Sequence, residues 1–355
     1  WFSLGTASMP TEAPAFYREF GKTLEQFDAS NNGLTEPYEI CFFPQLRTLN
    51  LSQNRLRSIH LAQCNYLKDF LYAEKIDLSH NKMGEIKITE EILRVAKGRK
   101  SWTSLAGNPL VGLSIDQVTD IKQLRTYFDS FIWPMGMKNL LFRGCRFSNG
   151  FSNFLPWPME FADMQRVRLY GNVVNDTLAA LAHFRKLEIL WASGNQVTGS
   201  LDFLITMSRL KELHIDHNPV QGTLSSFLHL PDIEVLDIER TGIDGTLEGL
   251  RNLFHLRELN CANLGLSGDL QSLQNLTSLK VFSANNNNFS GNIDLLTRLE
   301  RLELAFLQNN QLSGTIEAIC RLNRSHSALK KIELQGNKDI DHRGNCSGNG
   351  IQLYI

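Results

Sequence analysis

Apolar and polar residues alternate in short runs along most of the chain, and each run ends three residues before a recurring asparagine. The clearest copies read LRTLNLSQNRL at residues 46–56, LEILWASGNQV at 187–197 and LKVFSANNNNF at 279–289. Strict alternation places successive side chains on opposite faces of a strand. Each run therefore predicts a short β-strand with one buried leucine-rich edge and one outward-facing set of polar side chains.

The template Leu-x-x-Leu-x-Leu-x-x-Asn-x-Leu recurs at regular intervals. Its asparagine position falls at Asn32, Asn54, Asn81, Asn108, Cys145, Asn172, Asn195, Asn218, Thr241, Leu264, Asn287, Asn310 and Asn337. Six consecutive intervals, from Asn172 to Asn310, are 23 residues long. A coil of this size cannot bury its own apolar edge, so neighbouring coils must stack on one another. The asparagines should then bond backbone groups and form a ladder along the stack.

A glycine follows the asparagine position by four residues in the regular half of the chain. It occurs at Gly199, Gly222, Gly245, Gly268, Gly291 and Gly314, each followed two residues later by Leu or Ile. Glycine at one fixed phase indicates a backbone turn with positive φ, which a Cβ atom disfavours.

The phrase Asn310-Gln311-Leu312-Ser313-Gly314-Thr315-Ile316 resembles the plant-type leucine-rich repeat subfamily, over roughly residues 172–337. The chain departs from that pattern because no proline follows the isoleucine and the period is 23 rather than 24 residues. The resemblance implies an α/β solenoid: a leucine-rich repeat horseshoe of about thirteen coils with a parallel concave sheet, convex turns and short helices. Members of the subfamily serve in receptor ectodomains, inhibitor proteins and protist surface proteins.

The first half of the chain is less regular. Residues 89–95 and 114–128 carry helical spacing behind an N-cap residue, which predicts convex helices there. We expect a cap or lead-in at 1–23, a solenoid at 24–340 (irregular over 24–171 and regular over 172–315) and a capping region at 316–355. Because the chain begins at Trp1 rather than Met, it is interpreted as processed or as part of a longer protein.

The composition narrows the class of partner. The formal net charge is −1, so nothing in the overall charge favours nucleic acid or an anionic membrane. No run approaches the 18 or so apolar residues of a membrane-spanning helix. The chain is rich in leucine (54) and asparagine (29), as the repeat requires.

Four of the six cysteines fall at matching repeat phases. Cys41 and Cys64 follow adjacent asparagine positions by 9 and 10 residues, and Cys320 and Cys346 do so by 10 and 9. Stacked coils lie about 5 Å apart, which suits a disulfide. We therefore predict Cys41–Cys64 and Cys320–Cys346, one at each end of the solenoid, with free core cysteines as the alternative. Cys145 and Cys261 replace core residues and are predicted to be buried single thiols.

Six sequons and the paired cysteines favour an extracellular or cell-surface setting. The candidate glycosylation sites are Asn50, Asn175, Asn275, Asn288, Asn323 and Asn345. A glycan at Asn50 would block the first coils, because this residue faces outward. No Cys-x-x-Cys or His-x-x-x-His pair occurs, so no metal site and no cofactor are expected.

The outward-facing strand positions of the middle coils form the candidate ligand-binding face. They are Arg143, Arg166, Arg168, Tyr170, Trp191, His214, Asp216, Asp237, Glu239 and Glu258. Aromatic side chains beside arginines are typical of interface hot spots, and the change from basic to acidic favours a partner of complementary polarity. The alternative is that Trp191 packs on Arg168 as a cation–π pair and the charges are simply solvated.

These features favour a non-enzymatic module. The carboxylates on an open sheet have no pocket that would raise their pKa and exclude water, and no phosphate-binding or nucleophile motif occurs. The leading hypothesis is protein or peptide recognition, or adhesion, through the concave face. The alternatives are a glycosylated, self-associating subunit of an extracellular fibre, wall or appendage, a glycan-binding protein, and a cytosolic scaffold with reduced thiols.

Overall fold

A computed structural model describes most of the chain. The described residues are 2–3, 23–35, 45–57, 73–90, 92–93, 102–134, 137–147, 161–169, 172–174, 177–322, 328–343 and 350–355. They form two compact units, Trp1–Met164 and Gln165–Ile355.

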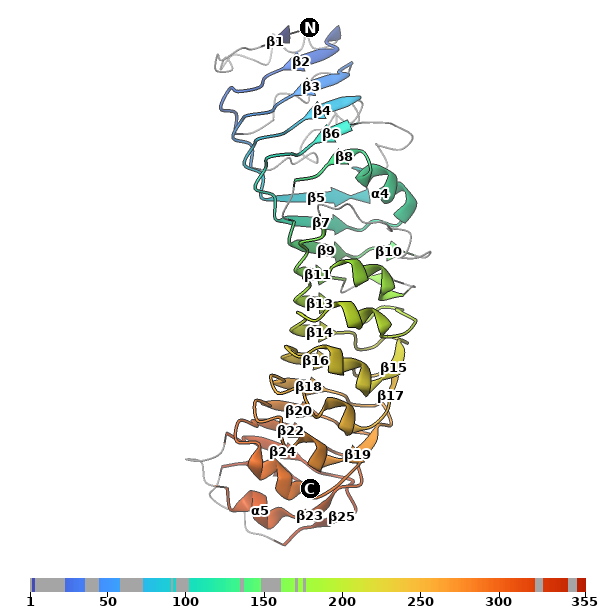
Figure 1. The fold of residues 1–355 in the computed structure, drawn as a ribbon, viewed down its shortest axis with the longest axis vertical. Helices are drawn as coiled ribbons and strands as arrows, with labels where there is room; N and C mark the ends of the chain where they lie inside the picture. Colours follow the sequence, from blue (N-terminus) through green and yellow to red (C-terminus); the bar gives the residue numbers. More distant parts are fainter. Residues whose placement is uncertain are drawn as a thin grey trace. The chain divides into compact units, whose positions relative to one another are not determined.

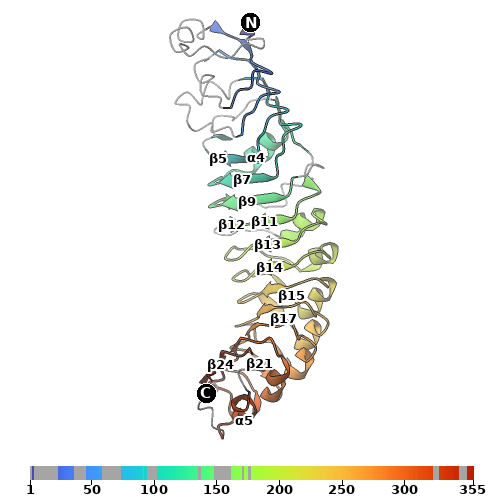
Figure 2. The same cartoon turned by 90° about the vertical axis from the view of Figure 1, so that its left-hand side faces the viewer.

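The second unit is a stack of coils whose inner strands form a long parallel sheet (Figures 1 and 2). The strands, in order, are β11 (Arg166–Arg168), β13 (Ile189–Trp191), β14 (Glu212–His214), β16 (Val235–Asp237), β18 (Glu258–Asn260), β20 (Val281–Ser283), β22 (Leu304–Phe306), β24 (Lys331–Glu333) and β26 (Gln352–Tyr354). Ile189 pairs with Glu212, and Glu212 pairs with Val235. The pairing offset of 23 residues equals the repeat length, which confirms the predicted stacking.

Short helices and turns cover the other, convex side of these coils. The 3-10 helices are η6 (Leu178–His183), η7 (Asp202–Thr206), η8 (Leu224–His229), η9 (Leu247–Leu250), η10 (Leu270–Leu273) and η11 (Ile293–Arg298), followed by the α-helix α5 (Ile316–Cys320). Strands outside the inner sheet form the pairs β15 (Gln221–Thr223) with β17 (Gly242–Asp244), β19 (Ser267–Asp269) with β21 (Asn288–Ser290), and β23 (Ser313–Thr315) with β25 (Asp339–Asp341). The further strand β12 is Val173–Val174.

The first unit is built from the same kind of parallel coil. One sheet has the order β1 (Phe2–Ser3), β2 (Gln26–Asp28), β3 (Thr48–Asn50), β4 (Lys75–Asp77), β6 (Trp102–Ser104) and β8 (Phe131–Ile132). Three longer strands, β5 (Glu85–Thr89), β7 (Gly112–Asp116) and β9 (Asn139–Arg143), pair in parallel, and β10 is Arg146–Phe147.

The helix predicted to begin at Ser114 begins later. Residues 112–116 form β7, which pairs with β5 and β9 along its full length. The helix α4 spans Ile121–Phe128, and its N-cap Asp120 accepts a hydrogen bond from the backbone N–H of Gln123. The apolar residue Ile115 fits both the helical and the strand pattern, and strand pairing on both sides decides in favour of the strand.

The repeating leucines form the core of the stack. Leu190, Leu213 and Leu236 are fully buried, one from each of three neighbouring inner strands. The predicted glycine turn is also confirmed, since all six glycines have positive φ, from +87° to +153°. At Gly268 a Cβ atom would lie 2.9 Å from the backbone nitrogen of Leu247, so the turn requires glycine for space as well as for φ.

The asparagine ladder predicted from the repeat is present. Asn218 is 2% exposed, and its Nδ2 donates to the carbonyl oxygens of Ala192, Ile215 and Asp216 at 2.9, 3.0 and 3.0 Å. Its Oδ1 accepts from the backbone N–H of Val197, at 2.9 Å, in the preceding coil. Each such side chain therefore joins two coils and holds the strand end of its own coil. Similar inter-coil bonds are made by Asn54, Asn81, Asn108, Asn195, Asn287, Asn310 and Asn337.

Replacing Asn218 by Ala should lower the free energy of unfolding by about 2–4 kcal/mol, because several buried backbone groups lose their partner. Chemical denaturation of the full chain, followed by circular dichroism, measures the change. The matched control is Asn275→Ala on unglycosylated material, since Asn275 is exposed in a turn and should change stability by less than about 0.5 kcal/mol. Equal effects of the two variants would contradict a stabilising role for the ladder.

Candidate ligand-binding face

The outward-facing residues of the second unit are brought into register by the strand pairing. Arg168 is paired with Trp191, Trp191 with His214, and His214 with Asp237. These four residues, with Asn260 opposite Asp237, are called the central row. The row exists because each outward position is displaced by one 23-residue period from the next, so equivalent side chains stand side by side across the sheet.

Trp191 is the half-buried centre of this row. The guanidinium carbon of Arg168 lies 4.5 Å from the centre of its ring, and the His214 ring meets it edge-on at 5.5 Å and 73°. Its indole N–H donates to Glu212 Oε2 at 3.3 Å. The cation–π pair considered from the sequence is thus confirmed. It fixes the indole ring in one orientation and leaves part of it accessible on the sheet face.

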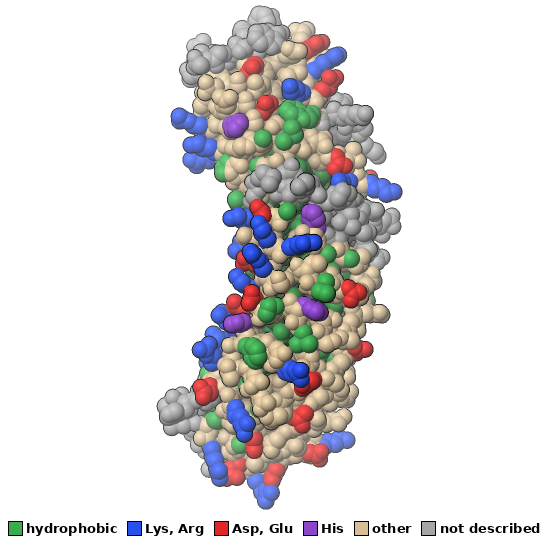
Figure 3. Space-filling view, in the orientation of Figure 1, with side chains coloured by type: hydrophobic (Ala, Val, Ile, Leu, Met, Phe, Trp, Pro, Cys, Tyr) green, Lys and Arg blue, Asp and Glu red, His purple; other side chains and the backbone are tan. Residues whose placement is uncertain are grey.

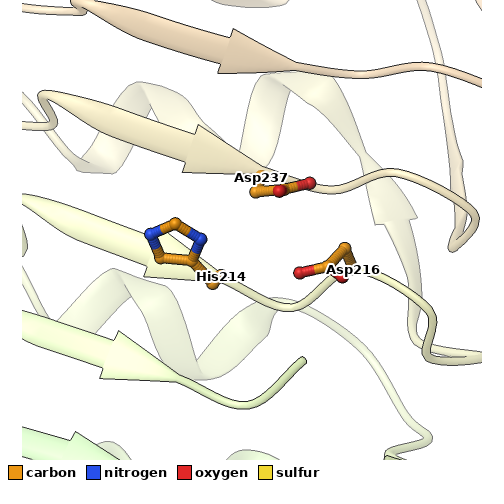
Figure 4. Close-up of side chains that lie close together, drawn as sticks. All are labelled: His214, Asp216 and Asp237. Atoms are coloured by element: carbon orange, nitrogen blue, oxygen red, sulfur yellow. The ribbon is translucent and has the colours of Figure 1, made fainter. Parts of the chain in front are cut away.

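Two residues of the central row, His214 and Asp237, form a cluster with Asp216, which is here called the His–Asp cluster (Figure 4). One potential donor atom from each residue lies within 4.8 Å of the other two. The hydroxyl of Ser193 donates to Asp216 Oδ1, and His217 Nδ1 lies 3.0 Å from Asp216 Oδ2. The carboxylate of Asp216 is therefore held by the side chains of Ser193 and His217.

The pKa of the Asp237 carboxyl group is raised above its ordinary value. Burial, together with the nearby charge of Asp216, raises the pKa of this group from 3.8 to about 6. The backbone N–H of Glu239, 3.3 Å from Oδ1, together with Asn260 and His214, opposes the shift. The two carboxylates lie close together, so the charge of Asp216 disfavours the charged form of the partly desolvated Asp237.

Glu239 connects the cluster to the following coils. Its two carboxylate oxygens accept hydrogen bonds from Asn260 Nδ2 at 3.1 Å and Asn263 Nδ2 at 2.9 Å. Arg240 Nε lies 3.5 Å from the same carboxylate. Both oxygens of Glu239 are thus engaged by side chains of the following coil.

The remaining predicted residues differ in their placement. Arg166 is half-buried at the start of β11, and Glu258 is exposed at the start of β18. Arg143 is exposed at the end of β9 in the first unit, and Tyr170 lies outside the described residues. Figure 3 shows a group of Lys and Arg side chains on the visible face of the middle coils, with acidic and histidine side chains next to it.

Sequence reasoning missed three residues of this face. Ser193 and Asn260 occupy outward phases of the repeat, two and four residues before an asparagine position, so the phase alone identifies them as neighbours. His217 lies at another fixed phase, directly before an asparagine position, where positive φ recurs, for example at Gly194 and Asn263. It adopts a φ of +54° directly before Asn218, a conformation that places its ring against Asp216.

The predicted glycosylation sites fall into three groups. Asn275 and Asn288 are exposed, and Asn288 Nδ2 lies 3.3 Å from the carbonyl oxygen of Gly265. Asn50 lies in β3, lining a hollow of about 150 Å³, and its Nδ2 donates to Asp28 Oδ2 at 3.2 Å. A glycan on Asn50 would leave one N–H on Nδ2 for that bond. Asn175, Asn323 and Asn345 lie outside the described residues.

The cysteines in the described part of the chain agree with what their positions in the repeat predicted. Cys145 and Cys261 are buried free thiols, as predicted. Burial raises the pKa of Cys145 to about 11 and also raises that of Cys261. Cys320 is disulfide-bonded. Since Cys41, Cys64 and Cys346 lie outside the described residues, the two specific pairings stay predictions.

Solved structures with the same fold include receptor and bacterial surface proteins. The plant peptide hormone receptor RGFR1 in complex with RGF2 is 20% identical with a TM-score of 0.51, over 89% of this chain and 60% of that one. An internalin from Listeria monocytogenes is 18% identical with a TM-score of 0.52, over 92% and 89%. A leucine-rich repeat protein from Leptospira interrogans is 17% identical with a TM-score of 0.51, over 98% and 81%.

The coils, the asparagine ladder and these likenesses define a leucine-rich repeat protein. Proteins of this class are typically non-enzymatic binding modules. No family model matches the sequence, and no curated protein does. The chain spans about 60% of the plant hormone receptor it matches. Among the described residues, no helix is long and apolar enough to cross a membrane.

Replacing Asp237 by Asn should stabilise the protein at pH 7–8 by about 1–3 kcal/mol, because the partly buried negative charge of Asp237 is removed. The buffer should contain a chelator, so that no metal ion compensates this charge. The folded pKa of about 6 exceeds the ordinary value of 3.8, so the folded state binds more protons between these values and wild-type stability falls as pH rises through that window. The difference in the free energy of unfolding between the wild type and Asp237→Asn should therefore vanish below about pH 4.

Denaturation curves from pH 3 to 8 measure this effect. The control is Glu258→Gln, which removes an exposed carboxylate from the next inner strand and should leave the pH profile unchanged. A gain of equal size at pH 3 and pH 8 for Asp237→Asn would contradict the assigned titration.

Proposed function

We propose that this protein is an extracellular or cell-surface recognition module that binds a peptide or protein segment on the outward face of its inner sheet. The observation that carries the proposal is the central row. A fixed, half-buried tryptophan lies between an arginine and a carboxylate cluster, in register across consecutive strands.

The chemistry of the row favours an extended polar partner. Its basic end, Arg168 with Arg166 two residues earlier on the same strand, suits an acidic group, while the His–Asp cluster suits a basic group roughly three strands away. Trp191 offers apolar area that is already ordered, so its immobilisation adds little entropy cost on binding. The likeness to a plant receptor solved with its peptide RGF2 is in keeping with such a ligand, although that likeness concerns the fold alone.

The extracellular setting is supported by the disulfide-bonded Cys320 and by the exposed sequon residues Asn275 and Asn288. Disulfides persist in oxidising compartments and are rare in the cytosol. In this proposal the phase-matched pairs Cys41–Cys64 and Cys320–Cys346 close the two ends of the stack, and the glycans lie away from the central row.

Non-reducing peptide mapping by mass spectrometry on native material tests this setting. We expect the two phase-matched disulfides, glycans on Asn275 and Asn288, and free thiols at Cys145 and Cys261. Six reduced cysteines and unmodified asparagines would instead indicate an intracellular scaffold.

The binding proposal is tested by displaying the full chain on yeast and selecting ligands from a library of random linear peptides. The double variant Trp191→Ala with Arg168→Ala should weaken binding of the selected peptides by at least about tenfold, since such anchors contribute 1–2 kcal/mol or more. The matched control is Arg251→Ala, an exposed arginine after η9 on the convex side, paired with Glu248.

Equal loss in both variants, or none in the double variant, would contradict a binding site on the central row. The alternative role as a structural subunit predicts another outcome. Light scattering would then show concentration-dependent self-association that the double variant leaves unchanged.

A further inference from the structure

The geometry points to a binding site for a divalent transition-metal ion, of the type of Zn²⁺, formed by His214, Asp216 and Asp237. This inference does not depend on the proposed recognition function. It also departs from the sequence, where the lack of Cys-x-x-Cys and His-x-x-x-His spacings predicts no metal site. The spacing of this cluster follows the repeat instead: His214 and Asp216 are two residues apart, and Asp237 comes one 23-residue period after His214.

Strand geometry brings the three donors together. His214 and Asp216 occupy outward positions at and just beyond the end of β14, and Asp237 stands directly opposite His214 on β16. Donor atoms from all three residues lie within 4.8 Å of one another. Donors around a tetrahedral zinc ion stand about 2.0–2.2 Å from the metal, so two of them lie about 3.3–3.6 Å apart. Small side-chain rotations therefore suffice to close the site.

The imidazole of His214 is available as a ligand. Within the described part of the chain its ring nitrogens make no hydrogen bond, and its ring contact is the edge-on packing with Trp191. Figure 4 shows His214 beside the two carboxylates on one face of the sheet. A carboxylate oxygen keeps accepting capacity after one hydrogen bond, so Asp216 and Asp237 can ligate without losing their present partners.

The surrounding residues orient the carboxylates. Ser193 and His217 hold the two oxygens of Asp216, and the backbone N–H of Glu239 holds Asp237. Metal sites commonly depend on such outer partners, which fix the direction of the ligand before the ion arrives. This support distinguishes the cluster from carboxylates that are merely solvated.

The donor set selects the class of ion. One imidazole nitrogen with two carboxylate oxygens suits Zn²⁺ or Mn²⁺, whereas Ca²⁺ and Mg²⁺ favour oxygen ligands alone. Two close negative charges on a half-buried surface also favour a divalent over a monovalent cation. Three protein ligands leave at least one coordination position open toward the sheet face, where water or an acidic group can complete it.

Isothermal titration of the chelator-treated full chain with ZnCl₂ tests the inference. We expect one site per chain that is weakened at least tenfold in His214→Ala and in Asp237→Asn, with a zinc-dependent rise in melting temperature that EDTA reverses. The matched controls are His255→Ala and Asp232→Asn, exposed residues outside the cluster, which should bind zinc as the wild type does.

Co²⁺ provides a second readout that a change in folding does not imitate. Cobalt bound at an imidazole–carboxylate site gives visible absorption bands, and these should appear in the wild type and the two controls and be absent in His214→Ala and Asp237→Asn. Absence of zinc binding to the wild type up to millimolar concentration would overturn the inference. Stoichiometric binding that persists in both cluster variants would overturn it as well.

Discussion

The hydrogen bonds of the buried asparagines are the interaction on which the rest of the structure depends. A strand of three residues has too few ladder bonds to fix its own register, and each asparagine adds bonds to the preceding coil and to its own strand end. Asn195 follows β13 and Asn218 follows β14, and both donate to the carbonyl oxygen of Ala192, so they fix the strand ends that carry Trp191 and His214. The candidate binding face is therefore a product of the stacking, with each coil supplying one set of side chains.

The ladder is interrupted beside the acidic part of that face. Thr241 bonds only the carbonyl of Ile238 in its own coil, at 2.8 Å, and Leu264 has no polar side-chain atom. A surface chain of hydrogen bonds crosses the same coils: Asn263 donates to Glu239, Asn286 to Asn263 and Asn309 to Asn286, at 2.7–2.9 Å. These exposed amides restore inter-coil bonds where the buried ones are lacking. Glu239 takes part in this chain, whereas Asp216 and Asp237 belong to the His–Asp cluster.

Much of this architecture could be predicted from the repeat phase. The asparagine spacing gave the strand register, the leucines gave the core, and Gly268 with its equivalents gave the convex turn. The start of α4 could not be predicted, because Ile115 and its neighbours fit a helix and a strand equally and only pairing with β5 and β9 decides between them. The contact of His217 with Asp216 was not predicted either: the repeat phase indicates the positive φ at His217, but not the side-chain rotamer that brings its ring to Asp216. The local sequence pattern thus predicts which residues face outward, while the hydrogen bonds between coils determine which of these side chains contact one another.

The most direct test of the central claim is to locate a bound ligand on the sheet. A library-selected peptide carrying a photoreactive group, cross-linked to the full chain and mapped by mass spectrometry, identifies the contacted segment. The account predicts cross-links within residues 166–169, 189–193, 212–217 and 235–240, the inner strands and the turns that follow them. Cross-links confined to the convex helices, such as η7 and η8, would contradict it.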